Sequence, residues 1–179
     1  INQRLAELYG IRGVNGAELR EVSVPADCPR GGFLTPAAIL KVTANGTATS
    51  PVLRGAWVLD RILGTPPPKP PENVGTLEPD TRGTKNIREQ LAKHRQLESC
   101  ASCHVKMDPP GFALESFDVT GTYRKNYRVL NPERKSGPWW TEGLVVDCSG
   151  KTPTGQTFGD IRELRKLVAE NPAQLARGI

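Results

Sequence analysis

The sequence predicts a mainly α-helical domain in which short helices are joined by long irregular loops, with one small β-hairpin. Glycine and proline are frequent, at 18 and 16 of 179 residues, and the hydrophobic fraction is only 37%. This composition favours many loops over a bundle of long helices. A chain of this length can still bury a core without disulfides or metals to support it.

Three short helices are expected in the first third of the chain. Leu5 and Leu8 share one face of the first helix, and Gly10 is a plausible end for it. Thr35 and Ser50 are the expected N-caps of the other two, because each precedes a proline, which is favoured at the first helical position. The predicted ranges are 2–9, a helix opening at Pro36, and 52–63.

The middle of the chain is predicted to alternate between extended and helical structure. Residues 65–71 contain five prolines and should run as a polyproline II spacer or strap. Residues 84–95 have a helical pattern, with Ile87 and Leu91 four positions apart. The run from Asp108 to Gly111, with two prolines, is expected to break any helix, and residues 112–117 to form an apolar turn that returns to the core.

The C-terminal part is predicted to contain the hairpin and one more helix. Residues 144–158 have a strand, glycine-bearing turn, strand pattern. Asp160 is the expected cap of a helix over 160–170, whose apolar face carries Ile161, Leu164 and Leu167.

Cys100-Ala101-Ser102-Cys103-His104 matches C-x-x-C-H, the pattern of covalent c-type haem attachment. Two thiols one helical turn apart can each add to a vinyl group of one porphyrin, and the adjacent histidine is then placed beneath the iron. The alternatives are a thiol redox pair, which wants a βαβ frame, and half a zinc site, which needs two more ligands. Neither is visible in the sequence, so the motif predicts one covalent haem c with His104 as an iron ligand.

The sixth iron ligand decides whether the iron is closed for electron transfer or open to small molecules. His94 lies ten residues before His104 and could cover the opposite face of the haem if the chain breaks near 97–99. Met107 follows His104 by only three residues, so it is better placed to pack on the ring than to cross it. The remaining possibilities are Tyr123, Lys106, Cys28 or an open site.

Cys28 and Cys148 lie outside the haem motif. Haem is attached covalently outside the bacterial cytoplasm, where disulfides persist, so we expect a disulfide between them. Two buried thiols, or one thiolate bound to iron, are the alternatives.

Charge and hydropathy restrict the partners and the location. The net charge is +5 and the pI about 9.2, but Lys and Arg alternate with acidic residues rather than forming a run. We therefore expect no nucleic-acid binding and instead a basic rim that docks an acidic redox protein. No segment is long enough to span a membrane and no signal peptide is present, so we expect a piece of a larger periplasmic or otherwise exported protein.

Several separate motifs occur in order along the chain: Thr49–Gly55, Trp57–Leu59, Gly64–Pro68, Cys103–His104, Met107–Pro109, Gly111–Glu115, Phe117–Asp118 and Gly121–Arg124. Together they resemble the large exported cytochrome c proteins peculiar to planctomycetes. The resemblance implies that this stretch is the C-terminal cytochrome c region of a longer polypeptide. It favours His94 over Met107 as a ligand and places Phe112, Tyr123 and Arg124 among the residues around the haem.

These observations predict a monohaem cytochrome domain that exchanges single electrons with a redox protein or with neighbouring domains of the same polypeptide. The expected division is the end of a preceding domain (1–30), the haem domain (31–130) and a hairpin-plus-helix segment packed on it (131–179). An open-site haem enzyme or small-molecule sensor is the alternative, with His94 or Tyr123 as distal acid or base. A carbohydrate-binding module that uses Trp139-Trp140 is a further alternative.

Overall fold

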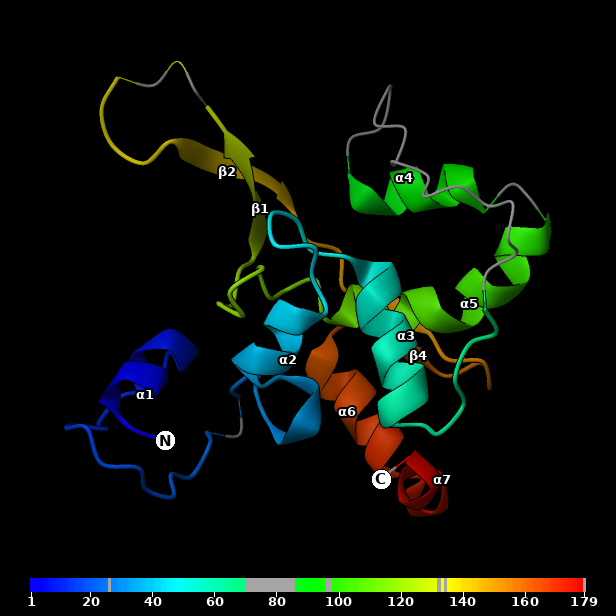
Figure 1. The fold of residues 1–179 in the computed structure, drawn as a ribbon, viewed down its shortest axis with the longest axis horizontal. Coiled ribbons are helices and arrows are strands. Elements are labelled where there is room, and N and C mark those ends of the chain that lie inside the picture. Colours follow the sequence, from blue (N-terminus) through cyan, green and yellow to red (C-terminus); the bar gives the residue numbers. More distant parts are fainter. Residues whose placement is uncertain (26, 70–85, 96–97, 132, 134, 179) are drawn as a thin grey trace.

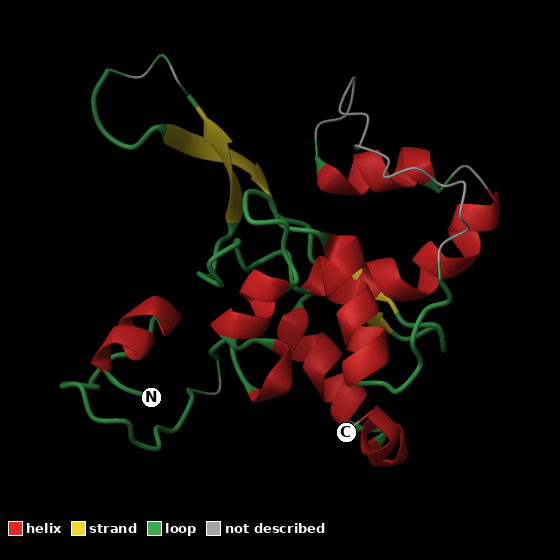
Figure 2. Cartoon of the chain, in the orientation of Figure 1, coloured by secondary structure: helices red, strands yellow, loops and turns green. Residues whose placement is uncertain are grey.

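The computed structural model describes residues 1–25, 27–69, 86–95, 98–131, 133 and 135–178. This part of the chain is mixed α/β, with short helices dominating and loops between them, as Figure 2 shows. The elements in chain order are α1 (Gln3–Tyr9), the 3-10 turn η1 (Gly32–Leu34), α2 (Ala37–Val42), α3 (Pro51–Arg61), α4 (Ile87–His94), α5 (Glu98–Ala113), β1 (Asn126–Leu130), β2 (Trp140–Val145), β3 (Gly150–Lys151), β4 (Thr157–Phe158), α6 (Ile161–Ala169) and α7 (Pro172–Gly178).

Helices α3 and α5 cross at the centre of the molecule (Figure 1). Two glycines permit this crossing, because a Cβ atom on Gly55 would lie 1.6 Å from the Met107 carbonyl oxygen, and one on Gly111 would lie 1.8 Å from that of Pro51. Any side chain at either position would push the two backbones apart. The sequence thus needs glycine at both points of contact.

The main core surrounds this crossing. It joins α3 and the end of α5 to α2, α6 and the β3–β4 hairpin, so segments from both halves of the chain meet there. Its fully packed members are Leu34, Leu40, Val58, Ile62, Ala113, Leu114, Phe117, Phe158, Ile161 and Leu164.

A buried arginine fixes the turn that follows α5. Arg54 is fully buried and donates to the carbonyl oxygens of Leu114 and Phe117, both at 2.7 Å, and lies 3.4 Å from a Glu115 carboxylate oxygen. Burial lowers the pKa of Arg54 to about 10, against the opposing effect of Glu115. Arg124 binds the other Glu115 oxygen at 3.2 Å. The turn is therefore held from α3 on one side and from residue 124 on the other.

The predicted helix starts at Ser50 and Asp160 are confirmed. The Ser50 hydroxyl accepts from the Leu53 N–H, and the Asp160 carboxylate accepts from the N–H groups of Arg162 and Glu163. The helix expected at 36 begins one residue later, with Pro36 itself as the cap. Gly10 ends α1 in the left-handed conformation, as predicted.

The predicted break at Asp108–Gly111 is wrong, because α5 continues through Pro109 and Pro110 to Ala113. A proline inside a helix removes a backbone hydrogen bond and costs about 3 kcal/mol. Helix α3 contacts α5 on both sides of the prolines, through Gly55 at Met107 and through Pro51 at Gly111. These contacts hold α5 in its helical conformation despite that cost. Asp108 is therefore part of the helix rather than of a turn.

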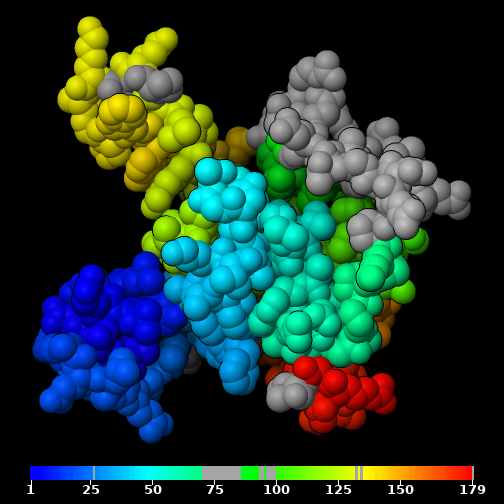
Figure 3. All heavy atoms as spheres, in the orientation of Figure 1, coloured from blue at the N-terminus to red at the C-terminus, as the bar shows by residue number. Residues whose placement is uncertain are grey.

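The predicted hairpin is confirmed only in its second half. Gly150 pairs with Phe158 and Lys151 with Thr157, whereas Val145 pairs with Asn126 in a separate two-stranded sheet. The composition gave no signal for that sheet, whose β1–β2 hairpin projects from the body (Figures 1 and 3). Trp139, the residue before β2, is exposed.

The N-terminal segment forms a second, small apolar cluster of Ala6, Ile11 and Val14. Arg30 ties it to the main body, since its guanidinium lies over the rings of Tyr9 and Phe117. Within the described residues, no helix is both long and apolar enough to cross a membrane. The end of the predicted proline strap, and the start of the helix predicted at 84, lie outside the described residues.

Candidate functional site

The C-x-x-C-H motif lies in the first half of α5. Cys100 and His104 are buried there, while Cys103 is partly exposed. Cys100 and Cys103 are separated by three positions and therefore lie on the same side of the helix, one turn apart. One helix thus carries both thiols and the imidazole.

A buried carboxylate holds the His104 ring. His104 Nδ1 lies 2.8 Å from Asp108 Oδ1, and Asp108 is fully buried. Because a carboxylate accepts hydrogen bonds, Nδ1 carries the proton and Nε2 carries the lone pair that can bind a metal. The contact exists because residues four apart face the same way on a helix, and α5 is helical through Asp108, where the sequence predicted a break.

The second Asp108 oxygen, Oδ2, accepts no hydrogen bond from the described residues. A cation of the described part lies near it: Arg95, in the connection between α4 and α5, has its Nε 3.7 Å away. At this distance Arg95 contributes charge rather than a hydrogen bond. An imidazole, a carboxylate and a guanidinium therefore lie next to one another beside the motif, from His104, Asp108 and Arg95.

Helix α4 is held on α5 by a second contact further along. The Arg88 guanidinium lies over the Phe112 ring, 3.9 Å from its centroid, and also donates to the Asp147 and Ser149 carbonyl oxygens. Phe112 itself is buried. Contacts from Arg88 and Arg95 thus keep α4 and the segment after it on the face of α5 that carries His104.

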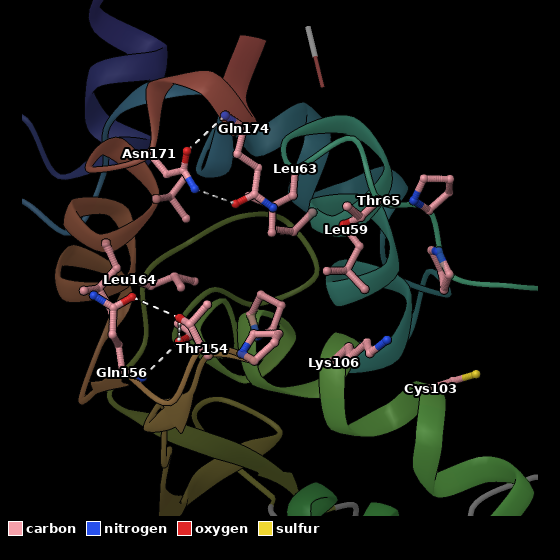
Figure 4. Close-up of a pocket in the computed structure, with 18 of the residues that line it drawn as sticks. Leu59, Leu63, Thr65, Cys103, Lys106, Thr154, Gln156, Leu164, Asn171 and Gln174 are labelled. Atoms are coloured by element: carbon pink, nitrogen blue, oxygen red, sulfur yellow. Dashed lines mark hydrogen bonds between the residues drawn. The ribbon is translucent and has the colours of Figure 1, made fainter. Parts of the chain in front are cut away.

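A pocket of about 560 Å³ opens on another side of α5. Its walls come from α3, α5, α6 and the turn between β3 and β4, and residues 65–68 border it (Figure 4). Leu59, Leu63, Leu164 and Leu167 make the lining largely apolar. Cys103 stands at its edge with the sulfur directed away from the centre, and Cys100 and His104 do not line it.

The other predicted haem residues are spread over several surroundings. Met107 is buried, and its backbone packs against Gly55 of α3. Tyr123 is 43% exposed and meets the edge of Phe117, with ring centroids 5.8 Å apart. Arg124 binds Glu115 and Thr49 in the network behind the end of α5. His94 is the last residue of α4, and its side chain lies outside the described part.

The disulfide predicted between Cys28 and Cys148 is not formed. Both residues lie in the described part as free, partly buried thiols. Cys148 is a neighbour of Ser116, and burial raises the pKa of its thiol; Cys28 lies in the N-terminal segment near Arg30. The two thiols therefore belong to different surroundings.

A family model matches residues 30–127, more than half of the chain, and describes its members as PSCyt3, proteins of unknown function (DUF1588). The chain belongs to this family. The PSCyt3 match includes the α3–α5 crossing, the C-x-x-C-H motif and Asp108, and it fits the resemblance to the planctomycete cytochrome proteins. No curated protein and no solved structure matches the chain.

Asp108 and Arg95 were not among the predicted site residues. The four-residue spacing of His104 and Asp108 was a usable signal, because it puts both side chains on one helical face. The two prolines after Asp108 obscured it. No sequence pattern indicated Arg95, because its contact with Asp108 depends on how the chain turns between α4 and α5.

Proposed function

We propose that this chain is a monohaem c-type cytochrome domain of a larger exported protein and carries single electrons to or from a redox partner. The observation that supports this most is the seating of His104, whose Nδ1 is held by the buried Asp108 within a C-x-x-C-H helix. Histidines that bind metals almost always donate their other ring N–H to a carboxylate, a carbonyl or a water. The donor set therefore fits an axial ligand that binds through Nε2.

Each residue of the motif has one role in this proposal. Cys100 and Cys103 would hold the porphyrin through thioether bonds, and His104 would bind the iron. A bound haem c would supply an iron centre that gains and loses one electron. The chain supplies rigidity, because the glycine contacts between α3 and α5 leave the helix little freedom to shift. Rigid ligands keep the reorganisation that accompanies electron transfer small.

We propose His94 as the sixth ligand. It ends α4, and the next residue, Arg95, reaches Asp108 on the same face of α5 as His104. Met107 is less suitable, because it follows His104 by only three residues and its backbone is packed against Gly55 of α3. Two histidine ligands would make the iron six-coordinate with a low potential.

The partner is proposed to be an acidic redox protein or a neighbouring domain of the same polypeptide. The net charge of +5 supports an acidic partner, because opposite charge raises the rate of encounter. The proposed location is the periplasm or another exported compartment, since c-type haem is attached there. We also propose that the chain is the C-terminal cytochrome c region of a planctomycete protein.

One observation favours an alternative, an open-site haem enzyme or small-molecule sensor. The apolar pocket beside Cys103 has a volume of about 560 Å³, within the range of small-molecule sites. If the ferrous protein binds carbon monoxide, and a Leu63→Trp variant that fills the pocket weakens this binding, the alternative replaces electron transfer.

The proposal is tested by expressing the chain with an export signal in a bacterium that matures c-type cytochromes. Haem should stay attached after denaturation in the wild type and in Cys148→Ser, a control that removes a thiol outside the motif. Cys103→Ser should lose one thioether, and the double variant Cys100→Ser, Cys103→Ser should carry no covalent haem. A wild-type chain without covalent haem would exclude the proposed function.

A further inference from the structure

Asp108 is a buried carboxylate with few of the contacts that normally make such a group tolerable. Its side chain is fully buried, yet it has one close partner, His104, and Oδ2 accepts no hydrogen bond from the described residues. Burying a charge without full pairing costs several kcal/mol. Within the described residues, the contacts of Asp108 therefore do not fully offset the cost of burying its charge.

Glu115, in the turn after α5, is a buried carboxylate whose contacts differ from those of Asp108. Its two oxygens are bound by Thr49 at 2.7 Å, Arg124 at 3.2 Å and Arg54 at 3.4 Å. Those donors link α3 to the turn after α5, so Glu115 has a structural role. Among the described residues, Asp108 contacts the imidazole one turn before it on its own helix, and Arg95 at 3.7 Å. Its placement serves His104 rather than the packing of elements.

We propose that Asp108 is the positioning residue of the iron ligand and sets the reduction potential of the haem, with Arg95 limiting its effect. This inference rests on the proposed function. A hydrogen bond from Nδ1–H to a carboxylate fixes the tautomer and raises the basicity of Nε2. A more basic ligand, together with a negative charge in a buried site, stabilises ferric iron over ferrous iron. Asp108 therefore lowers the potential.

Arg95 acts in the opposite direction. Its guanidinium places a positive charge 3.7 Å from Oδ2 and is itself only partly buried. Removing this cation leaves the carboxylate charge less compensated, which stabilises ferric iron further. Replacing Asp108 and replacing Arg95 should therefore shift the reduction potential in opposite directions. A loss of folding would not produce opposite shifts.

The test is a spectroelectrochemical titration of the haem-loaded wild type and three variants. Asp108→Asn should raise the ferrous-to-ferric ratio at a fixed ambient potential about tenfold, a shift of about 59 mV for one electron. Arg95→Gln should lower the potential. Asp160→Asn is the matched control, because it removes a carboxylate charge from the start of α6 while asparagine keeps the cap; its potential should equal that of the wild type.

A second measurement covers the case in which Asp108→Asn does not take up haem. In the haem-free chain, ¹⁵N chemical shifts of the His104 ring should report a proton on Nδ1 in the wild type. A proton on Nε2 there, or equal potentials for Asp108→Asn and Asp160→Asn, would overturn the role of Asp108. Those results would leave the proposed function intact, whereas absence of covalent haem in the wild type would remove both.

Discussion

Replacing Gly111 by alanine tests the packing that positions the haem motif. The new Cβ would lie 1.8 Å from the Pro51 carbonyl oxygen and 2.6 Å from its carbon, well inside the 3.4 Å at which ordinary contact begins. All of these atoms belong to backbone, so no flexible side chain can yield. Overpacking of this kind costs about 3 kcal/mol. The helix propensity of alanine returns about 1 kcal/mol, so the net loss should be about 2 kcal/mol.

The assay is urea unfolding followed by far-UV circular dichroism, together with thermal melts. A loss of about 2 kcal/mol corresponds to a melting temperature lowered by about 4–8 °C for a domain of this size. Gly159→Ala is the control, because the nearest atom to its Cβ is a flexible Glu163 oxygen at 3.5 Å. If Gly111→Ala were as stable as the wild type or more so, the close crossing of α3 and α5 would be refuted.

Three further predictions concern the network, a cap and the thiols. Glu115→Gln should cost about 3 kcal/mol in urea unfolding because it leaves Arg54 buried and uncompensated; a cost below that of a surface variant such as Glu142→Gln would contradict the network. Asp160→Ala should cost about 1 kcal/mol at neutral pH. Partial burial acts to raise the pKa of Asp160, but hydrogen bonds from Arg162 and Glu163 outweigh burial and lower the pKa. The stabilisation by the ionised cap is therefore fully present above the ordinary value of 3.8. It should disappear as the pH falls through the lowered pKa. Mass mapping of unreduced protein should find no peptide linking Cys28 to Cys148, and Cys148 should react with iodoacetamide more slowly than a model thiol because burial raises the pKa of its thiol.

Local signals in the sequence predicted the starts of α3 and α6. Ser50 and Asp160 could be identified because a cap depends only on a side chain and the backbone two or three residues later. The motif at Cys100, Cys103 and His104 is likewise local. These features need no knowledge of the rest of the fold.

Features that depend on contacts between distant segments were missed. The prolines after Asp108 normally end a helix, and only the packing of α3 explains why α5 continues. The pairing of Val145 with Asn126 joins segments whose loop gives no hairpin signal. Asp108 was missed because the predicted break at 108–111 removed it from the helix that carries His104, and Arg95 was missed because its contact with Asp108 depends on how the chain turns between α4 and α5.

The most direct test of the account is a near-infrared magnetic circular dichroism spectrum combined with a redox titration of the haem-loaded chain. Ligation by His104 and His94 predicts low-spin, six-coordinate ferric iron with two nitrogen ligands, a single reversible one-electron step, and no change in the ferrous spectrum with carbon monoxide. A high-spin ferric spectrum, or ready binding of carbon monoxide, would contradict electron transfer as the function of this domain.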